Sequence, residues 1–514
     1  MADRAIKDAV KGGSVVFIGS ILGAGLDFLI KIVIARFWGP TGYGLINLGL
    51  SILMLAAVFS LFGLETGIAR FVSFYAGNKE FEKVKGTIFA GTKIALFFSI
   101  ILGCLIFLFS RQLSISCFHE SDLIPIIKIF AFALPFVALS KVLLSALRGF
   151  KCMKYLVYCR NLFGKGVILF VLIFFHGCGI INVAFAYFLG FIFMCTLGFY
   201  YLKLSFPGLI DKRLKKISTK KELLSFSWPV IAASSIAEIR RKTDIFLLAY
   251  FLSTSQVGLY SAAFPIATLL AIPICSFDTI LLPVASDLYS QGKINEIRHL
   301  YTVTAKWLFY FAFPLFLVFF FLPENILLFL FGVQYINAST SLKILSIGYI
   351  GVILIAPRNQ IILAMGRSKI IFLLAGIGAG SNVILNLILI PYFGINGAAL
   401  ATSISLILMA LVGLGFLYYY LRVHPFGIDH LKCSISSATV FGIFFILHKI
   451  MFSQINWAFP VLWLSYWLVN ALVLLIIIGL NSEDEMIISA IENKTRLNLG
   501  FIRKLGHINM KANF

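Results

Sequence analysis

Long apolar runs recur along the whole of this chain, and each is long enough to cross a lipid bilayer as a helix. About 20 apolar residues span the hydrocarbon core, and the sequence holds about fourteen such runs, separated by polar residues or by Gly and Pro. They lie near 14–36, 43–69, 87–109, 124–147, 155–175, 180–202, 223–250, 257–285, 300–322, 341–364, 370–390, 395–421, 433–452 and 458–480. Hydrophobic residues make up 60% of the chain and charged residues 12%, against about half and a quarter in soluble proteins. The sequence therefore predicts an all-α polytopic membrane protein and excludes a soluble enzyme or a disordered scaffold.

The distribution of basic residues predicts how the chain is oriented in the membrane. With the N-terminus in the cytoplasm, 28 of the 43 Lys and Arg residues fall in cytoplasmic segments and 3 in outer loops. Cytoplasmic loops of membrane proteins carry such an excess. We therefore expect both termini in the cytoplasm and a location in the plasma (inner) membrane. Because orientation explains the net charge of +22, no nucleic-acid partner is expected.

Two basic segments lie outside the predicted helices. The segment 203–221 (KLSFPGLIDKRLKKISTKK) is interpreted as an orientation signal and solvated linker, with docking on anionic lipid head groups as the alternative. In the C-terminal tail, Ser482 and Glu485 have the spacing of a capping box, and apolar residues follow on one face. This pattern predicts a short amphipathic helix on the inner leaflet.

An internal repeat indicates how the helices are grouped. At an offset of about 214–215 residues, Gly44 matches Gly258, and the block that begins at Gly179 matches the block that begins at Gly394. Two parallel six-helix halves explain these matches. The predicted organisation is an N-terminal lobe at 1–205, a basic cytoplasmic linker at 206–222, a C-terminal lobe at 223–421, two additional helices at 422–480 and a cytoplasmic amphipathic tail at 481–514.

Charged residues inside the predicted helices are the candidates for function. An ionisable side chain at membrane depth costs a few kcal/mol and should face a cavity or a partner. The spans hold twelve basic and five acidic residues, so a wet interior would be cationic. The seventh helix is the most heavily charged, with Glu238 and Lys242, and Arg240 and Asp244, spaced as i,i+4 pairs. Arg241 is left without a local partner, which makes its guanidinium the best candidate for binding phosphate.

Other spans add candidates for the same cationic cavity. The tenth helix carries Arg358 beside Asn359 and Gln360 in the middle of its run, directly after a proline. On the first helix, Asp27 and Lys31 have i,i+4 spacing and can satisfy each other. The predicted substrate-binding cations are Arg241, Arg240, Arg358, Lys141, Lys31, Arg160 and Lys165, supported by Asp27, Glu238, Asp244, Asn359 and Gln360.

Catalytic and metal-binding patterns are missing from the sequence. It contains no HExxH, GxSxG or P-loop motif, and its eight cysteines include no CxxC pair. We predict no catalytic residue, no metal site and no cofactor. Any energy input is expected from a Na⁺ or H⁺ gradient, the membrane potential or consumption of the product.

Three segments carry a resemblance to a known family. The segments 35–44 (ARFWGPTGYG), 62–70 (FGLETGIAR) and 394–402 (GINGAALAT) resemble the polysaccharide-transporter, or oligosaccharide flippase, family. That family shares a superfamily with multidrug and toxin extrusion exporters and the peptidoglycan lipid flippase. The resemblance covers nearly the whole chain, but the second copy of the first segment, 250–258 (YFLSTSQVG), lacks Gly-Pro.

The resemblance implies an architecture and a substrate. It implies two six-helix lobes in a V, two extra C-terminal helices and a central cavity open alternately to each side of the membrane. It also implies that the protein flips an oligosaccharide, joined by one or two phosphates to a polyprenyl or dolichyl lipid, to the outer leaflet for surface polysaccharide or glycan assembly. A polysaccharide polymerase or glycosyltransferases are expected as partners.

Two other functions stay open at this point. A cation-coupled multidrug exporter would need acidic residues that command the cavity, whereas the interior here has more basic residues. A membrane glycosyltransferase or polymer ligase would need an acidic or His/Arg cluster in a large outer loop, and the predicted outer loops are short. We therefore expect a transporter and not an enzyme.

Overall fold

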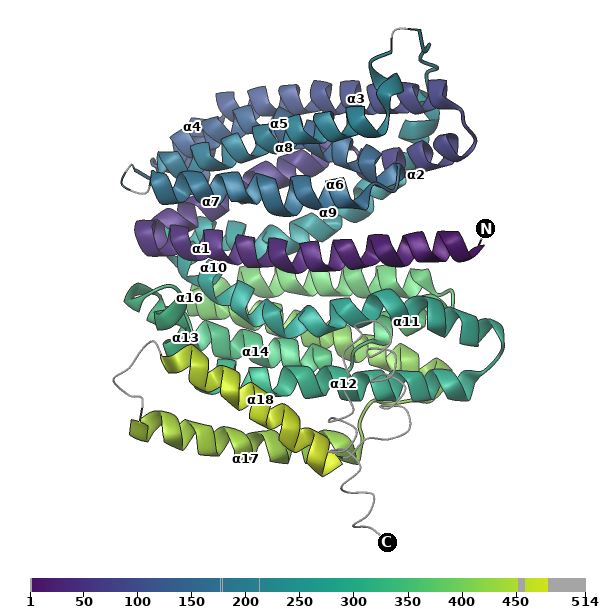
Figure 1. The fold of residues 1–514 in the computed structure, drawn as a ribbon. Helices are drawn as coiled ribbons and strands as arrows, with labels where there is room; N and C mark the ends of the chain where they lie inside the picture. Colours follow the sequence, from purple (N-terminus) through teal and green to yellow (C-terminus); the bar gives the residue numbers. More distant parts are fainter. Residues whose placement is uncertain (1, 176, 178, 212, 452–457, 479–514) are drawn as a thin grey trace. The chain divides into compact units, whose positions relative to one another are not determined.

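The protein is built from long helices packed side by side (Figure 1). The computed structural model describes residues 2–175, 177, 179–211, 213–451 and 458–478. Over these residues all regular elements are helices, and ten helices are long and apolar enough to cross a membrane. This confirms the prediction of an all-α multi-pass membrane protein, while the count of fourteen spans stays a prediction. The predicted tail helix near Ser482 lies outside the described residues.

The helices divide between two compact units. Unit 1 is Met1–Ala262, Leu330–Asn337 and Val383–Ala398, and unit 2 is Ala263–Phe329, Ala338–Asn382 and Ala399–Phe514. The first ten helices are α1 (Ala2–Leu61), α2 (Leu64–Gly77), α3 (Phe81–Leu108), α4 (Ser110–Gln112), α5 (Leu123–Gly149), α6 (Met153–Val157), α7 (Gly164–Phe174), α8 (Ile181–Ser205), α9 (Lys220–Phe251) and α10 (Thr254–Thr268). The others are α11 (Ile272–Ser290), α12 (Ile294–Phe321), α13 (Pro323–Leu330), α14 (Ser339–Ile353), α15 (Arg358–Ala364), α16 (Ser368–Leu421), α17 (Ile428–Met451) and α18 (Ala458–Ile478). The units group residues by contact, whereas the predicted lobes follow the sequence repeat, so the lobe boundaries stay a prediction.

Two of the long helices are each broken at a glycine. In α1 the break is at Gly39, with φ 65° and ψ −175°, and in α16 it is at Gly394, with φ 58° and ψ −134°. A positive φ strains a residue that has a Cβ, and glycine adopts it freely. Each break falls between two predicted spans, so the expected apolar runs on either side of it form two helices that meet at a kink.

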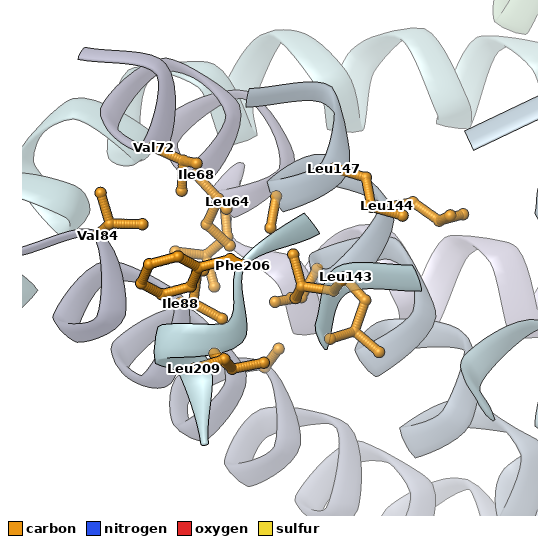
Figure 2. Packing of buried hydrophobic residues seen from close by; sticks show 14 of the residues in the cluster. Leu64, Ile68, Val72, Val84, Ile88, Leu143, Leu144, Leu147, Phe206 and Leu209 are labelled. Carbon is orange, nitrogen blue, oxygen red and sulfur yellow. The ribbon is translucent and has the colours of Figure 1, made fainter. Parts of the chain in front are cut away.

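The core of unit 1 is a cluster of apolar side chains from α2, α3 and α5. Figure 2 shows Ile68 of α2, Ile88 of α3 and Leu143 of α5 pointing into it. Phe206 and Leu209, which follow α8, enter the same cluster. Burial of such side chains contributes about 1.5–3 kcal/mol each. In unit 2 a separate cluster forms around Tyr301.

The segment between α8 and α9 differs from the solvated linker that the sequence predicted. Lys85 of α3 is buried and donates to the carbonyl oxygens of Asp211 (2.6 Å) and Leu214 (3.2 Å). The Thr87 and Thr219 hydroxyls lie 2.9 Å apart, in hydrogen-bond contact. The linker is therefore packed on α3. Phe206 and Leu209 explain this difference, because their side chains are buried and a solvated linker would expose them to water.

The first turns of α9 are joined to α2. The Tyr75 hydroxyl donates a hydrogen bond to Glu222, and the guanidinium of Arg70 lies 4.3 Å from the centre of the Phe226 ring. Burial and the neighbouring Glu222 carboxylate raise the pKa of Tyr75 to about 12. The phenol therefore stays a neutral donor at physiological pH, and α9 begins as part of unit 1.

Tyr75→Phe removes this hydrogen bond and is expected to lower the free energy of unfolding by about 1 kcal/mol. Because the pKa of Tyr75 lies above the value of about 10 in an unfolded chain, the contribution is complete below pH 10 and is lost as the pH rises through about 12. Apparent melting temperatures of the detergent-solubilised wild type and variant, followed from about pH 8 upwards, check this. Equal melting temperatures at about pH 8 would contradict it.

The internal repeat has a structural counterpart in unit 1. A Cβ added at Gly44 would collide with the carbonyl oxygen of Thr254, and a Cβ added at Gly258 would collide with the carbonyl oxygen of Pro40. Gly44 and Gly258 are partners at the repeat offset of 214, and so are Pro40 and Thr254. A contact in which each partner exchanges roles with the other is what a two-fold axis produces. The reciprocal contact therefore supports the predicted repeat.

Candidate substrate-binding site

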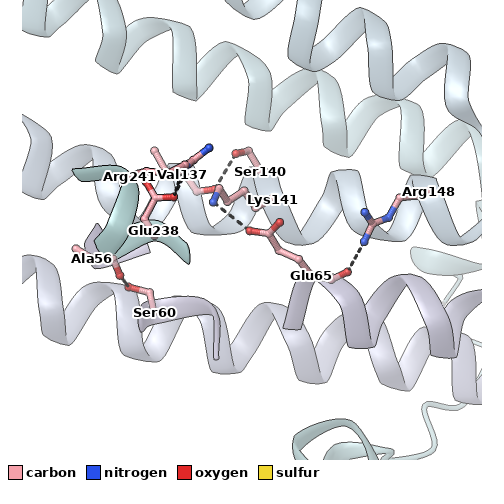
Figure 3. Close-up of polar contacts among 9 residues, drawn as sticks. All are labelled: Ala56, Ser60, Glu65, Val137, Ser140, Lys141, Arg148, Glu238 and Arg241. Atoms are coloured by element: carbon pink, nitrogen blue, oxygen red, sulfur yellow. Dashed lines mark hydrogen bonds and ion pairs between the residues drawn. The ribbon is translucent and has the colours of Figure 1, made fainter. Parts of the chain in front are cut away.

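The charged segment of α9 forms different pairs from those that its spacing predicted. The Arg241 Nε donates to Glu238 Oε2 at 3.1 Å, and the two side chains form an ion pair (Figure 3). Residues three apart on a helix are neighbours as much as residues four apart. The prediction that Arg241 lacks a local partner is therefore wrong. Its side chain nevertheless stays 64% exposed, while that of Glu238 is 9% exposed.

Asp244, at the end of this charged segment, is held by residues of other helices. Its Oδ2 accepts a hydrogen bond from the Tyr260 hydroxyl of α10 at 2.6 Å, and its Oδ1 accepts one from the Asn386 amide of α16 at 2.7 Å. The sequence predicted Arg240 as its partner. All three side chains are buried, which explains the choice, because a buried carboxylate is stabilised by donors that are themselves packed around it. Sequence reasoning missed Tyr260 and Asn386, although an asparagine inside an apolar run is a visible signal.

The first helix forms an ion pair with α7 and not within itself. Lys165 Nζ lies 2.6 Å from Asp27 Oδ2 and also donates to the Gly23 carbonyl at 2.9 Å. The predicted pair of Asp27 with Lys31 is therefore replaced. Lys31 forms no ion pair among the described residues, but its charge still attracts Asp27 and is repelled by Lys165 and Lys242.

A third ion pair joins α2 and α5. Lys141 Nζ lies 3.0 Å from Glu65 Oε1, and Arg148 donates to the Glu65 carbonyl oxygen at 3.0 Å (Figure 3). Sequence reasoning counted Glu65 among the membrane acids but gave it no role. Arg160, another predicted cation, is exposed and donates to the side chain of its neighbour Asn161 at 3.2 Å.

Arg358 lies in the interior of unit 2. It is 2% exposed, and a Cβ added at Gly413 would lie 2.7 Å from its Nε. Asn359 and Gln360 follow it as half-buried residues, and Gln360 hydrogen-bonds Asp278. The side chain of Arg358 is therefore enclosed by protein atoms. Among the predicted cations, Arg358 belongs to unit 2, and Arg241, Arg240, Lys141, Lys31, Arg160 and Lys165 belong to unit 1.

The polar cluster, defined as Asp27, Lys31, Glu65, Lys141, Lys165, Glu238, Arg241 and Lys242 of unit 1, has an excess of positive charge. Its three acids each contact one cation: Asp27 with Lys165, Glu65 with Lys141, and Glu238 with Arg241. Lys31 and Lys242 form no ion pair within the described part of the chain. Such a cluster attracts anions, and Arg241 presents a largely exposed planar donor that suits phosphate or carboxylate oxygens.

Two models of known protein families match parts of this chain. A family model described as "Polysaccharide biosynthesis protein" matches residues 9–289. A second family model, described as MatE, matches residues 229–388.

Two relatives and one solved structure match most of the chain. An uncharacterized membrane protein of Methanocaldococcus jannaschii is 24% identical over 80% of this chain and 84% of its own length. A putative O-antigen transporter of Shigella flexneri is 23% identical over 76% of this chain and 94% of its own. The structure of the lipid II flippase MurJ in an inward closed conformation has a TM-score of 0.68 and 18% identity, and covers 90% of this chain and 98% of that chain. The MurJ structure shows that the fold is shared.

Proposed function

Because the chain belongs to the polysaccharide biosynthesis protein family, we propose that it flips a lipid-linked oligosaccharide across the membrane. The sugar is joined to a polyprenyl or dolichyl lipid through one or two phosphates and moves from the cytoplasmic to the outer leaflet. A relative named as a putative O-antigen transporter and the fold shared with a lipid II flippase support this proposal. The protein then acts as a transporter and not as an enzyme.

The excess of positive charge in the polar cluster is the observation that carries the proposal. Cations inside membrane-spanning helices are expensive unless a partner compensates them. Five cations of the cluster face three acids, and Asp27 and Glu238 each attract a second cation, Lys31 and Lys242, besides the one that they pair with. Two positive charges therefore stay uncompensated within the cluster. A phosphate or diphosphate head group has the charge and the acceptor oxygens to fill that role.

Alternating access is the mechanism that we propose for the movement. The phosphates bind at Arg241, Lys31 and Lys242, the sugar follows them through a hydrated path, and the lipid tail remains in the bilayer. The ion pairs restrain the cluster: Glu238 holds Arg241 close to α9, and Lys165 neutralises Asp27. An arriving phosphate competes with Glu238 for the guanidinium of Arg241, because both present oxygen acceptors to the same donors.

The proposal also includes the location of the protein, its energy source and its partner enzymes. The protein lies in the plasma (inner) membrane with both termini in the cytoplasm, and it uses no cofactor. A Na⁺ or H⁺ gradient or the membrane potential drives or biases the cycle. Glycosyltransferases that assemble the oligosaccharide act before it, and a polysaccharide polymerase that consumes the oligosaccharide acts after it.

Flipping in proteoliposomes tests the proposal. A labelled lipid-diphosphate oligosaccharide is placed in vesicles with the purified protein, and exposure of the sugar to an external lectin or glycosidase is followed over time. We expect exposure that depends on the protein and that a lipid of the same tail without phosphate does not show. Equal exposure in protein-free vesicles would contradict the proposal.

The match to the MatE model favours a second candidate, a cation-coupled multidrug exporter. Under that function the buried carboxylate of Asp244 would matter more than the cations. Exchange of an organic cation for H⁺ or Na⁺ in the same vesicles, with no movement of lipid-linked sugar, would select it. A membrane glycosyltransferase or ligase remains the third alternative, and formation of a new glycosidic bond in the assay would reveal it.

A further inference from the structure

The segment between α8 and α9 presents basic and apolar side chains together on its exposed surface. We define the basic–apolar strip as the exposed basic and apolar residues that the structure describes at 203–221, which include the last turn of α8 and the first residues of α9. They are Lys203, Leu204, Ile210, Arg213, Lys215, Lys216, Ile217, Lys220 and Lys221. The apolar members Leu204, Ile210 and Ile217 are 56%, 49% and 43% exposed. Basic and apolar side chains on one surface are the combination that binds at a membrane interface.

The acids near the strip do not neutralise it. Asp211 accepts a hydrogen bond from the Arg213 backbone N–H at 2.8 Å, and Glu222 accepts one from Tyr75. The six basic side chains of the strip form no ion pair within the described residues. Six basic side chains against the two acids Asp211 and Glu222 therefore leave the strip with a clear excess of positive charge.

The strip has a defined conformation because α3 holds its backbone. Lys85 donates to the carbonyl oxygens of Asp211 and Leu214, which lie between strip residues in the sequence, and the Ile217 N–H donates to the Glu82 carbonyl at 3.2 Å. A Cβ added at Gly86 would collide with the Ile217 carbonyl oxygen, so only glycine permits this approach. A surface ordered before binding loses less conformational entropy when a ligand binds. The segment is thus a preorganised surface and not a tether.

The position of the strip along the chain places it at the boundary of the bilayer. The membrane-spanning helix α8 ends at Ser205, and α9 begins at Lys220. At such a boundary isoleucine and leucine enter the head-group region, while lysine and arginine stems reach the phosphates.

We propose that the basic–apolar strip binds the anionic head groups of membrane lipids. Lysines near an anionic membrane surface attract it, and the three apolar side chains add contacts that free phosphate in solution cannot provide. This binding is separate from the transported substrate, because the strip and the polar cluster share no residue. The lipid acts as a partner that fixes this face of unit 1 against one leaflet.

Titration of the purified, delipidated full-length protein with phosphatidylglycerol or phosphatidylcholine, followed by native mass spectrometry, tests the proposal. We expect phosphatidylglycerol to bind more tightly. The triple variant Lys215→Gln, Lys220→Gln and Lys221→Gln should weaken its binding by about fivefold per cation, or about a hundredfold in all. The matched control is Lys293→Gln, Lys369→Gln and Lys432→Gln, which removes three exposed cations of unit 2 and should change binding by less than about threefold.

Three results would overturn the inference. The first is equal affinity for the two lipids, and the second is an equal loss in the control triple variant. The third is a loss in Arg241→Gln as large as that in the strip variant, which would place the anionic lipid at the polar cluster instead.

Lys85→Met examines the preorganised backbone separately from the surface charge. It leaves every cation of the strip in place but removes the donor that holds the carbonyl oxygens of Asp211 and Leu214. We expect about tenfold weaker phosphatidylglycerol binding with the preference over phosphatidylcholine retained. Unchanged affinity in a variant with the wild-type melting temperature would contradict the role of preorganisation.

Discussion

Alanine at Gly44 or at Gly258 is expected to reduce transport by about tenfold or more, and to about the same extent at either position. Each new Cβ would collide with a backbone carbonyl oxygen, of Thr254 or of Pro40. A rotamer change cannot move a carbonyl, and overpacking of this kind costs about 1–3 kcal/mol, or about a five- to 150-fold shift of a conformational equilibrium. In the proposed alternating-access cycle, such a shift depopulates the conformation described here. Initial flipping rates in proteoliposomes measure the effect.

The equal loss of transport expected for Gly44→Ala and Gly258→Ala is the most specific part of this prediction. Gly25→Ala, also in α1, is the matched control, because a Cβ there would meet no atom within 4 Å. Its flipping rate should stay close to that of the wild type. A large loss at one glycine and none at the other would show that the reciprocal contact does not act as a symmetric unit. Melting temperatures separate a conformational shift from a failure to fold.

Arg241→Ala is expected to abolish flipping while leaving the protein folded. The guanidinium side chain is 64% exposed and pairs with Glu238 on its own helix, and exposed pairs contribute only about 0–1 kcal/mol to stability. Removal of this planar donor takes away the strongest expected phosphate contact. Arg241→Lys should keep part of the activity, since an ammonium retains the charge but not the bidentate geometry. Flipping rates and lipid-diphosphate affinity in the same preparation measure both effects.

Glu238→Gln is the informative companion to this variant. It keeps the shape of the side chain but removes the charge that competes with phosphate, so substrate affinity should rise or stay unchanged. Arg111→Ala, which removes an exposed cation of α4 outside the polar cluster, serves as the control. Normal transport by Arg241→Ala, or an equal loss in Arg111→Ala, would remove Arg241 from the substrate site.

The membrane-spanning architecture could be predicted because its main cause is local in sequence. A run of apolar residues must form a helix in lipid to satisfy its own backbone, and that rule needs no knowledge of neighbouring segments. Gly39 and Gly394 show where the rule stops. The sequence marked the ends of spans there, but whether two helices are joined by a loop or meet directly at a kink depends on backbone angles that packing selects.

The sequence predicted which residues belong to the candidate site better than it predicted which of them pair with each other. A charged residue inside an apolar run is easily recognised in the sequence, and Arg241, Lys165 and Asp27 were identified in this way. Their partners were not, because helix spacing relates only residues of one helix. Lys165 reaches Asp27 from another helix, and Asp244 is satisfied from two other helices.

What the sequence determined by itself is thus the all-α membrane-spanning architecture, the repeat and the excess of positive charge, since each follows from composition and spacing along one chain. The tertiary structure decided which charges neutralise each other, that Arg358 is buried while Arg241 is largely exposed, and that the basic segment between α8 and α9 is packed on α3. The physical reason is that electrostatic energy and burial depend on distances between helices. Those distances come from the packing of apolar faces, which no single segment specifies.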